Sequence, residues 1–143
     1  MTRVTTRIAT QDATLQAVVL SRLPLHYATG EDIADDRPAH VRAASSITWI
    51  DHRIALVQDD ANFVALLEPG NGAVYPIALP RGEGGLRQFD DARGNKKFKL
   101  DLEACAALPG EHESSLLAFG SGSKKRRRNV ADRKSTRLNS SHG

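Results

Sequence analysis

Short apolar segments separated by polar turn residues recur along residues 45–79. Each segment contains β-branched or aromatic side chains, which favour strands, and the residues between the segments are rich in Asp, Asn, Gly and Pro. Turns at Asp51–His52, Asp59–Asn62 and Pro69–Gly72 are short enough to be hairpin connections. The pattern predicts an antiparallel four-stranded meander: Ser45–Ile50, Arg53–Gln58, Phe63–Glu68 and Ala73–Leu79.

Two local signals refine this meander. Asn71-Gly72 is a candidate for a type I′ turn, because both residue types tolerate positive φ. Pro76 cannot donate a backbone hydrogen bond, so it places the fourth strand at an edge of the sheet.

A second unit follows the Gly-rich segment Pro80–Asn95. Polar and apolar residues alternate along Lys96–Leu108, which predicts a strand with Lys97, Lys99, Asp101 and Glu103 on one face. After a turn at Pro109–Glu113, Ser115–Gly120 is a second strand. Upstream, the apolar run Ala17–Leu20 within Ala13–Pro24 predicts a further strand.

The two units correspond in their order of strand, turn, strand and polar turn. Ser46 and Glu103 then occupy matching positions, 57 residues apart. A repeated meander at this spacing is typical of β-propeller blades, and the chain would hold about one and a half of them. The predicted fold class is therefore all-β: antiparallel four-stranded meanders forming part of a propeller.

The second unit also resembles a known family. The segments Lys99–Pro109 (KLDLEACAALP) and Ser115–Val130 (SLLAFGSGSKKRRRNV), like RIALVQDDANFVAL at Arg53–Leu66, are similar to an uncharacterised bacterial β-propeller family of unknown function. A more distant resemblance connects the chain to phytase-like esterase propellers, which carry Gly where this chain has Ala104. The resemblance implies a propeller fold and no particular activity.

Net charge changes the interpretation of the C-terminus. The chain carries a net charge of +3, but residues 121–143 hold eight Lys or Arg and one Asp. The remaining residues hold 12 basic and 16 acidic side chains. The segment Asp132–His142 resembles translated sequencing adapter, so we interpret 132–143 as an artefact tail, 13–131 as a propeller fragment of a truncated chain, and 1–12 as disordered.

Partners and compartment follow from what the composition lacks. Lys124–Arg128 is a basic run without interleaved aromatic residues, so it lacks a platform for base stacking and we expect no nucleic-acid partner. No apolar run approaches the length of a membrane span, and no secretory signal is apparent. With Cys105 as the single cysteine, no intrachain disulfide can form, and the cytoplasm is the expected compartment.

Candidate site residues lie where the innermost strands of a propeller would begin. A small polar ligand is expected at this end, and the alternative is an ionic network that seats one blade against the next. The candidate ligand-binding residues are Ser46, Lys97, Lys99, Asp101, Glu103, Ser121 and Ser123.

Carboxylates raise a second possibility. Asp59 and Asp60 are candidate ligands for a hard cation such as Ca²⁺, against the alternative that they cap a turn. Glu103 is then a candidate catalytic residue. Two functions remain open: a ligand-binding or scaffold domain, and a metal-assisted hydrolase of the phosphoesterase or lactonase type.

The interpretation of the tail is directly testable. We expect the source gene, resequenced across the codon for Ala131, to continue into further strand-turn repeats without the sequence DRKSTRLNSSH. A reading frame that does encode this segment would contradict the truncation and would restore nucleic-acid binding as a function.

Overall fold

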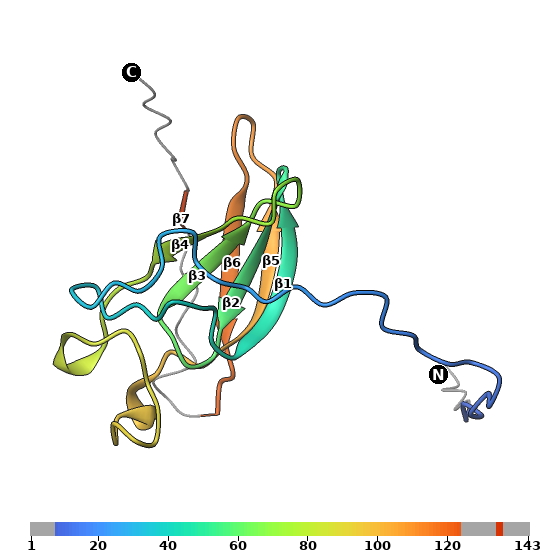
Figure 1. Cartoon of the computed structure of the whole chain (residues 1–143), viewed down its shortest axis with the longest axis horizontal. Coiled ribbons are helices and arrows are strands. Elements are labelled where there is room, and N and C mark those ends of the chain that lie inside the picture. Colours follow the sequence, from blue (N-terminus) through green and yellow to red (C-terminus); the bar gives the residue numbers. More distant parts are fainter. Residues whose placement is uncertain (1–7, 124–133, 136–143) are drawn as a thin grey trace, which may run out of the picture.

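The computed structural model describes residues 8–123 and 134–135. It is all-β, with no α-helix in this part of the chain, and contains two antiparallel sheets that are not closed into a barrel (Figure 1). The first has the order β1-β2-β3-β4 and the second the order β5-β6-β7. The strands are β1 (Ala44–Ile50), β2 (Arg53–Gln58), β3 (Phe63–Leu67), β4 (Val74–Ala78), β5 (Leu102–Leu108), β6 (Ser115–Gly120) and β7 (Lys134–Ser135).

The predicted meander is confirmed, with β4 at the outer edge of its sheet. Pro76 lies in this edge strand opposite Ala65, as its missing N–H group requires. The turn between β3 and β4 differs from the prediction. Of its residues 69–72 only Gly72 has a positive φ, and its N–H donates to the Glu68 carbonyl over 2.8 Å, so the type I′ prediction was wrong.

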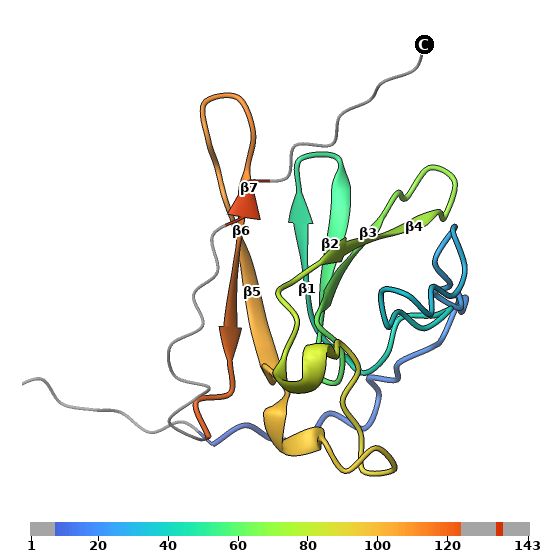
Figure 2. The same ribbon diagram turned by 90° about the vertical axis from the view of Figure 1, so that its left-hand side faces the viewer.

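The two sheets pack face to face (Figure 2). β5 lies against β1 and β2, and the core between the sheets combines residues from all three strands with β3 and β6. Its fully buried members include Ala55, Val57 and Leu102. This is the arrangement expected when each strand turns one apolar face inward.

A segment that precedes β1 covers the other face of the four-stranded sheet. Residues 25–41 run across it, and Tyr27 packs with Leu56, Ala65 and Val74. The Tyr27 hydroxyl accepts a hydrogen bond from Gln58 Nε2 over 2.9 Å. This segment is here called the strap. Gln58 is buried, and its Oε1 accepts from the N–H of Arg42 over 2.8 Å, so one amide holds the strap at Tyr27 and at the residue that follows its end.

One predicted strand is wrong, and another begins later than the alternating segment predicts. Ala17–Leu20 forms no strand: it pairs with no other described residue, and Leu20 is 93% exposed. β-propensity alone cannot form a strand without a partner for the backbone hydrogen bonds. The predicted strand Lys96–Leu108 begins only at Leu102, because Lys96–Phe98 forms a 3₁₀ turn and Asp101 has a φ of 60°.

The predicted correspondence between the units is real, but its register differs by one residue. β1 skips a partner between Ala44 and Ser46, and β5 does so between Leu102 and Ala104. Ser45 and Glu103, 58 positions apart, are therefore the equivalent bulge residues, in place of Ser46 and Glu103. The β5–β6 loop is four residues longer than the β1–β2 turn, so the second strands are offset by 62.

The residue before each bulged strand offers a test of backbone strain. Ala43 has a φ of 41°, which costs an L-residue about 1 kcal/mol or more, whereas Ala44 does not have positive φ. Ala43→Gly should raise the free energy of unfolding by roughly 0.5 kcal/mol, and the control Ala44→Gly should lower it by a similar amount. Urea denaturation measures both, and equal signs would contradict the assignment.

Candidate functional site

One backbone contact is repeated at the end of the molecule where β1 and β5 begin. The Asp59 N–H donates to the Ala43 carbonyl over 2.9 Å, and the Ser121 N–H donates to the Asp101 carbonyl over 2.9 Å. Ala43 and Asp101 both have positive φ. Each acceptor thus precedes the first strand of its unit and each donor follows the second, which brings Asp59 and Ser121 to equivalent positions.

Lys99 connects the two units at this end. Its Nζ lies 2.6 Å from Asp59 Oδ2, 2.8 Å from Asp101 Oδ1 and 3.4 Å from Asp60 Oδ1. The Lys99 side chain is 8% exposed and that of Asp101 7%, so this ion pair is largely removed from water. One ammonium therefore neutralises part of a group of three carboxylates, here called the Lys99 cluster.

Opposing effects set the pKa values in the Lys99 cluster. Burial opposes the charged form of Lys99, but hydrogen bonds and charges from Asp101 and Asp59 outweigh it and raise the pKa of the ammonium. Burial likewise opposes ionisation of Asp101, but hydrogen bonds from Asp59, Lys99 and Ser121 lower its pKa well below the usual range. Burial and the hydrogen bond with Asp101 raise the pKa of Asp59. Of Asp59 and Asp101, Asp59 is therefore the carboxyl that takes up a proton first as the pH falls.

Two serines extend the cluster toward the surface. The Ser121 hydroxyl donates to Asp101 Oδ2, and it lies 2.9 Å from the Ser123 hydroxyl. The Ser123 hydroxyl also approaches Asp101 Oδ2 at 3.5 Å. Both serines are exposed, whereas Asp101 is buried. A ligand in solution can therefore reach two hydroxyl groups that contact the carboxylate of Asp101.

The structure also brings three carboxylates within reach of one cation. Oxygen atoms of Asp59, Asp101 and Glu103 lie within 4.8 Å of one another. Three carboxylates suit a hard cation such as Ca²⁺. Lys99 Nζ already contacts Asp59 and Asp101, so a metal ion at this position must compete with an ammonium.

Two of the predicted ligand-binding residues, Lys97 and Ser46, make contacts outside the Lys99 cluster. Lys97, predicted to share a strand face with Lys99, places its Nζ 4.8 Å from the centre of the Phe98 ring. The Ser46 hydroxyl accepts a hydrogen bond from the Cys105 N–H over 3.2 Å between the two sheets. Its role is thus in the contact between the units. Glu103 is exposed at the bulge of β5.

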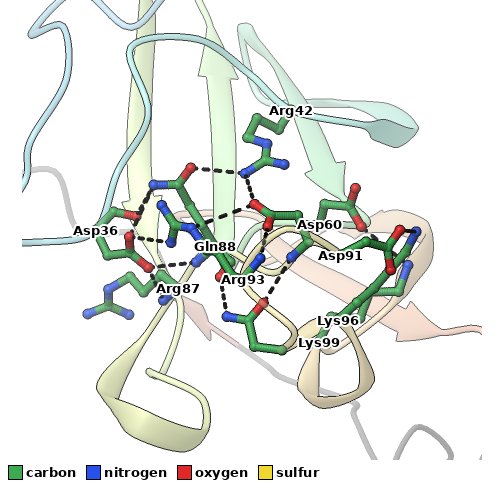
Figure 3. Close-up of polar contacts among 11 residues, drawn as sticks. Asp36, Arg42, Asp60, Arg87, Gln88, Asp91, Arg93, Lys96 and Lys99 are labelled. Atoms are coloured by element: carbon green, nitrogen blue, oxygen red, sulfur yellow. Dashed lines mark hydrogen bonds and ion pairs between the residues drawn. The ribbon is translucent and has the colours of Figure 1, made fainter.

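Sequence reasoning missed a second polar network, around Asp36. The Asp36 carboxylate accepts hydrogen bonds from the N–H groups of Arg87 and Gln88 and from Arg93, over 2.7 to 2.8 Å. Figure 3 shows these side chains converging between the strap and the loop that follows β4. Burial opposes ionisation of Asp36, but the hydrogen bonds from Arg93, Arg87 and Gln88 lower its pKa.

This network fixes the long loop that precedes the Lys99 cluster. Gln88 Oε1 accepts from Arg42, which also pairs with Asp90 over 3.3 Å. The signal in the sequence was the opposition of charge between the acidic segment 28–38 and the arginines of 80–95. Among residues 8–123 and 134–135, no helix has the length and apolar character that a membrane span requires.

Comparison with known proteins gives one relationship. A family of unknown function, DUF6929, matches residues 40–141, and the match therefore includes both units and the Lys99 cluster. A search of the curated proteins found no match. A search of the solved structures found none either. The basic run Lys124–Arg128 lies outside the residues that the structure describes.

Removing the ammonium tests the Lys99 cluster. Lys99→Met leaves Asp59, Asp60 and Asp101 without their cation, and we expect the free energy of unfolding at pH 7 to fall by about 3 kcal/mol. The control Lys96→Met removes an exposed pair with Asp91 and should cost less than about 1 kcal/mol. Equal losses in the two variants would contradict the role given to Lys99.

The pH dependence has a defined direction. Because the folded-state pKa of Asp101 lies below its ordinary value of 3.8, its ion pair stabilises the fold above pH 3.8 and is lost as the pH falls through the folded-state pKa. In Lys99→Met the carboxylates repel, so protonation becomes favourable for folding. The difference between variant and unsubstituted chain, measured by urea denaturation, should shrink from pH 7 to pH 4. A constant difference would argue against electrostatic repulsion.

Proposed function

Because the chain belongs to DUF6929, a family of unknown function, we propose its role from the geometry: it is part of a β-propeller that binds a small polar ligand beside the Lys99 cluster. Three features support the propeller. The meander runs outward from β1 to the edge strand β4, and β5 begins a second unit against β1. The backbone hydrogen bond before each first strand, accepted by Ala43 in one unit and by Asp101 in the other and here called the clamp, recurs. We place this propeller in the cytoplasm of a bacterium.

The ligand chemistry follows from charge. Among the residues that the structure describes here, Asp59, Asp60, Asp101 and Glu103 outnumber the cation Lys99, so this cluster carries excess negative charge and disfavours anions. Carboxylates and serine hydroxyls accept hydrogen bonds from a ligand that carries several donors. A neutral polyol, such as a sugar, fits this site better than its phosphate ester. The observation that carries the proposal is the exposed pair Ser121 and Ser123 on buried Asp101.

A thermal-shift comparison tests ligand binding. Glucose should raise the melting temperature of the chain in a concentration-dependent way, and glucose 6-phosphate should do so less, because the carboxylates repel it. Ser123→Ala should abolish the shift. The control Ser114→Ala, in the loop at the opposite end of β5, should retain it. A shift that is the same in both variants would sink the proposed site, and no shift with glucose would remove this ligand class.

A metal-assisted hydrolase is the second candidate, favoured by the proximity of Asp59, Asp101 and Glu103. It requires Ca²⁺ or a similar ion to displace Lys99, or to bind beside it through Glu103. Ca²⁺ titration by calorimetry should then show binding that strengthens in Lys99→Met. Hydrolysis of a phosphoester or lactone should be lost in Glu103→Gln. Binding that is unchanged by Lys99→Met would count against a metal at this position.

A further inference from the structure

The contact between the two units uses a different face of each. In the first unit, one face of β1–β2 packs on the second unit; we call it the back face. In the second unit, the packed face of β5–β6 is here called the front face. The back face of β1–β2 comprises Ser46, Thr48, Ile50, Ala55 and Val57, and the front face of β5–β6 comprises Cys105, Ala107, Leu116 and Ala118.

Equivalent residues of the two units are 58 positions apart in the first strands and 62 positions apart in the second strands. With these offsets, the residues of each face in one unit identify the same face in the other unit. Ile47 and Trp49 of β1 are equivalent to Cys105 and Ala107, so they belong to the front face of the first unit. Leu108 of β5 is equivalent to Ile50, and Phe119 of β6 is equivalent to Val57, so they belong to the back face of the second unit. The described residues therefore present one front face and one back face that do not meet each other.

Both of these faces are apolar and open. Ile47 and Trp49 are each 61% exposed, and Leu108 and Phe119 are 44% and 43% exposed. The strap covers Ile54 and Leu56 on the front face, but it leaves the β1 margin uncovered. The β1 margin is the part of the front face that would make the contact, because its equivalent in the second unit, β5, is the strand that lies against β1 and β2.

We propose that a second copy of this chain occupies these faces, with the back face of β5–β6 in one copy packed on the β1 margin of the front face in the next. The packing repeats the contact between the two units within one chain, which supplies its geometry. Because the two faces differ, the association is head-to-tail and leaves one open face at each end. Such a contact builds rings or open chains.

The lack of charged side chains on the two open faces supports self-association through them. The two open faces carry no charged side chain at the positions assigned to them. These positions are Ala104, Ala106, Leu108, Leu117 and Phe119 on the back face of β5–β6, and Ile47 and Trp49 on the front face of β1–β2. Aromatic anchors such as Trp49 dominate the energy of protein interfaces when they become buried. The proposal depends on the repeat and is independent of ligand binding, so either can fail alone.

Complementary variants test the head-to-tail contact. Trp49→Asp disables the front face and Phe119→Asp disables the back face. Both positions are exposed, so each variant should fold, which far-UV circular dichroism checks. Analytical ultracentrifugation should show that the unsubstituted chain associates. For each variant alone, the protein concentration at the midpoint of association should be roughly tenfold higher or more. An equimolar mixture should form 1:1 dimers, because each variant keeps the face that the other lacks.

The control is Ile33→Asp, which places the same charge on a strap side chain that is 86% exposed and is not among the residues assigned to either face. It should associate as the unsubstituted chain does. If either face variant alone associates at the same protein concentration as the unsubstituted chain, the proposal is overturned in favour of a symmetric contact. A chain that stays monomeric at all concentrations also overturns it, and leaves further units of a longer chain as the occupants of both faces.

Discussion

The structure depends on covering the apolar face that the four-stranded sheet turns toward β5 and β6. A meander of four strands leaves two faces that cannot both remain in water. The strap covers one of them through Tyr27, which Gln58 holds by a buried hydrogen bond. The second unit covers the other, with Val57 and Leu102 fully buried between the sheets. The Lys99 cluster lies at the end of this contact and joins residues from both sides, so the site exists only because the two units are packed together.

The sequence pattern predicted correctly those strands that depend on a short apolar run closed by turn residues. Arg53–Gln58 and Ser115–Gly120 have the predicted bounds, because an apolar run closed by turn residues forms a strand wherever a neighbour is available. Ala17–Leu20 has the same composition and forms no strand, since no described strand pairs with it. Asp101 interrupts an alternating segment through its positive φ, and alternation of polarity gives no warning of a backbone angle. The one-residue shift between the units has the same origin, because a bulge changes register without changing composition.

The candidate site was predicted in part. Lys99, Asp101, Asp59, Asp60 and the two serines were chosen as residues near the start of the inner strands, and they do converge there. The reason differs from the one predicted, since Lys99 and Asp101 do not share a strand face. Lys97 was included because of the alternation and lies elsewhere. The network around Asp36 joins residues about 50 positions apart, and only the folded chain shows which acid meets which arginine.

The clamp before each first strand has an evolutionary consequence. In both units a carbonyl at a positive-φ residue accepts from the N–H group that follows the second strand, at Ala43 and again at Asp101. This contact uses only backbone atoms, so it places few demands on side chains. Duplication of the underlying gene segment would add a unit that already carries the clamp and both packing faces. The number of units can therefore change during evolution without the invention of a new interface, while the side chains around each clamp are free to differ, as Asp59 and Ser121 do.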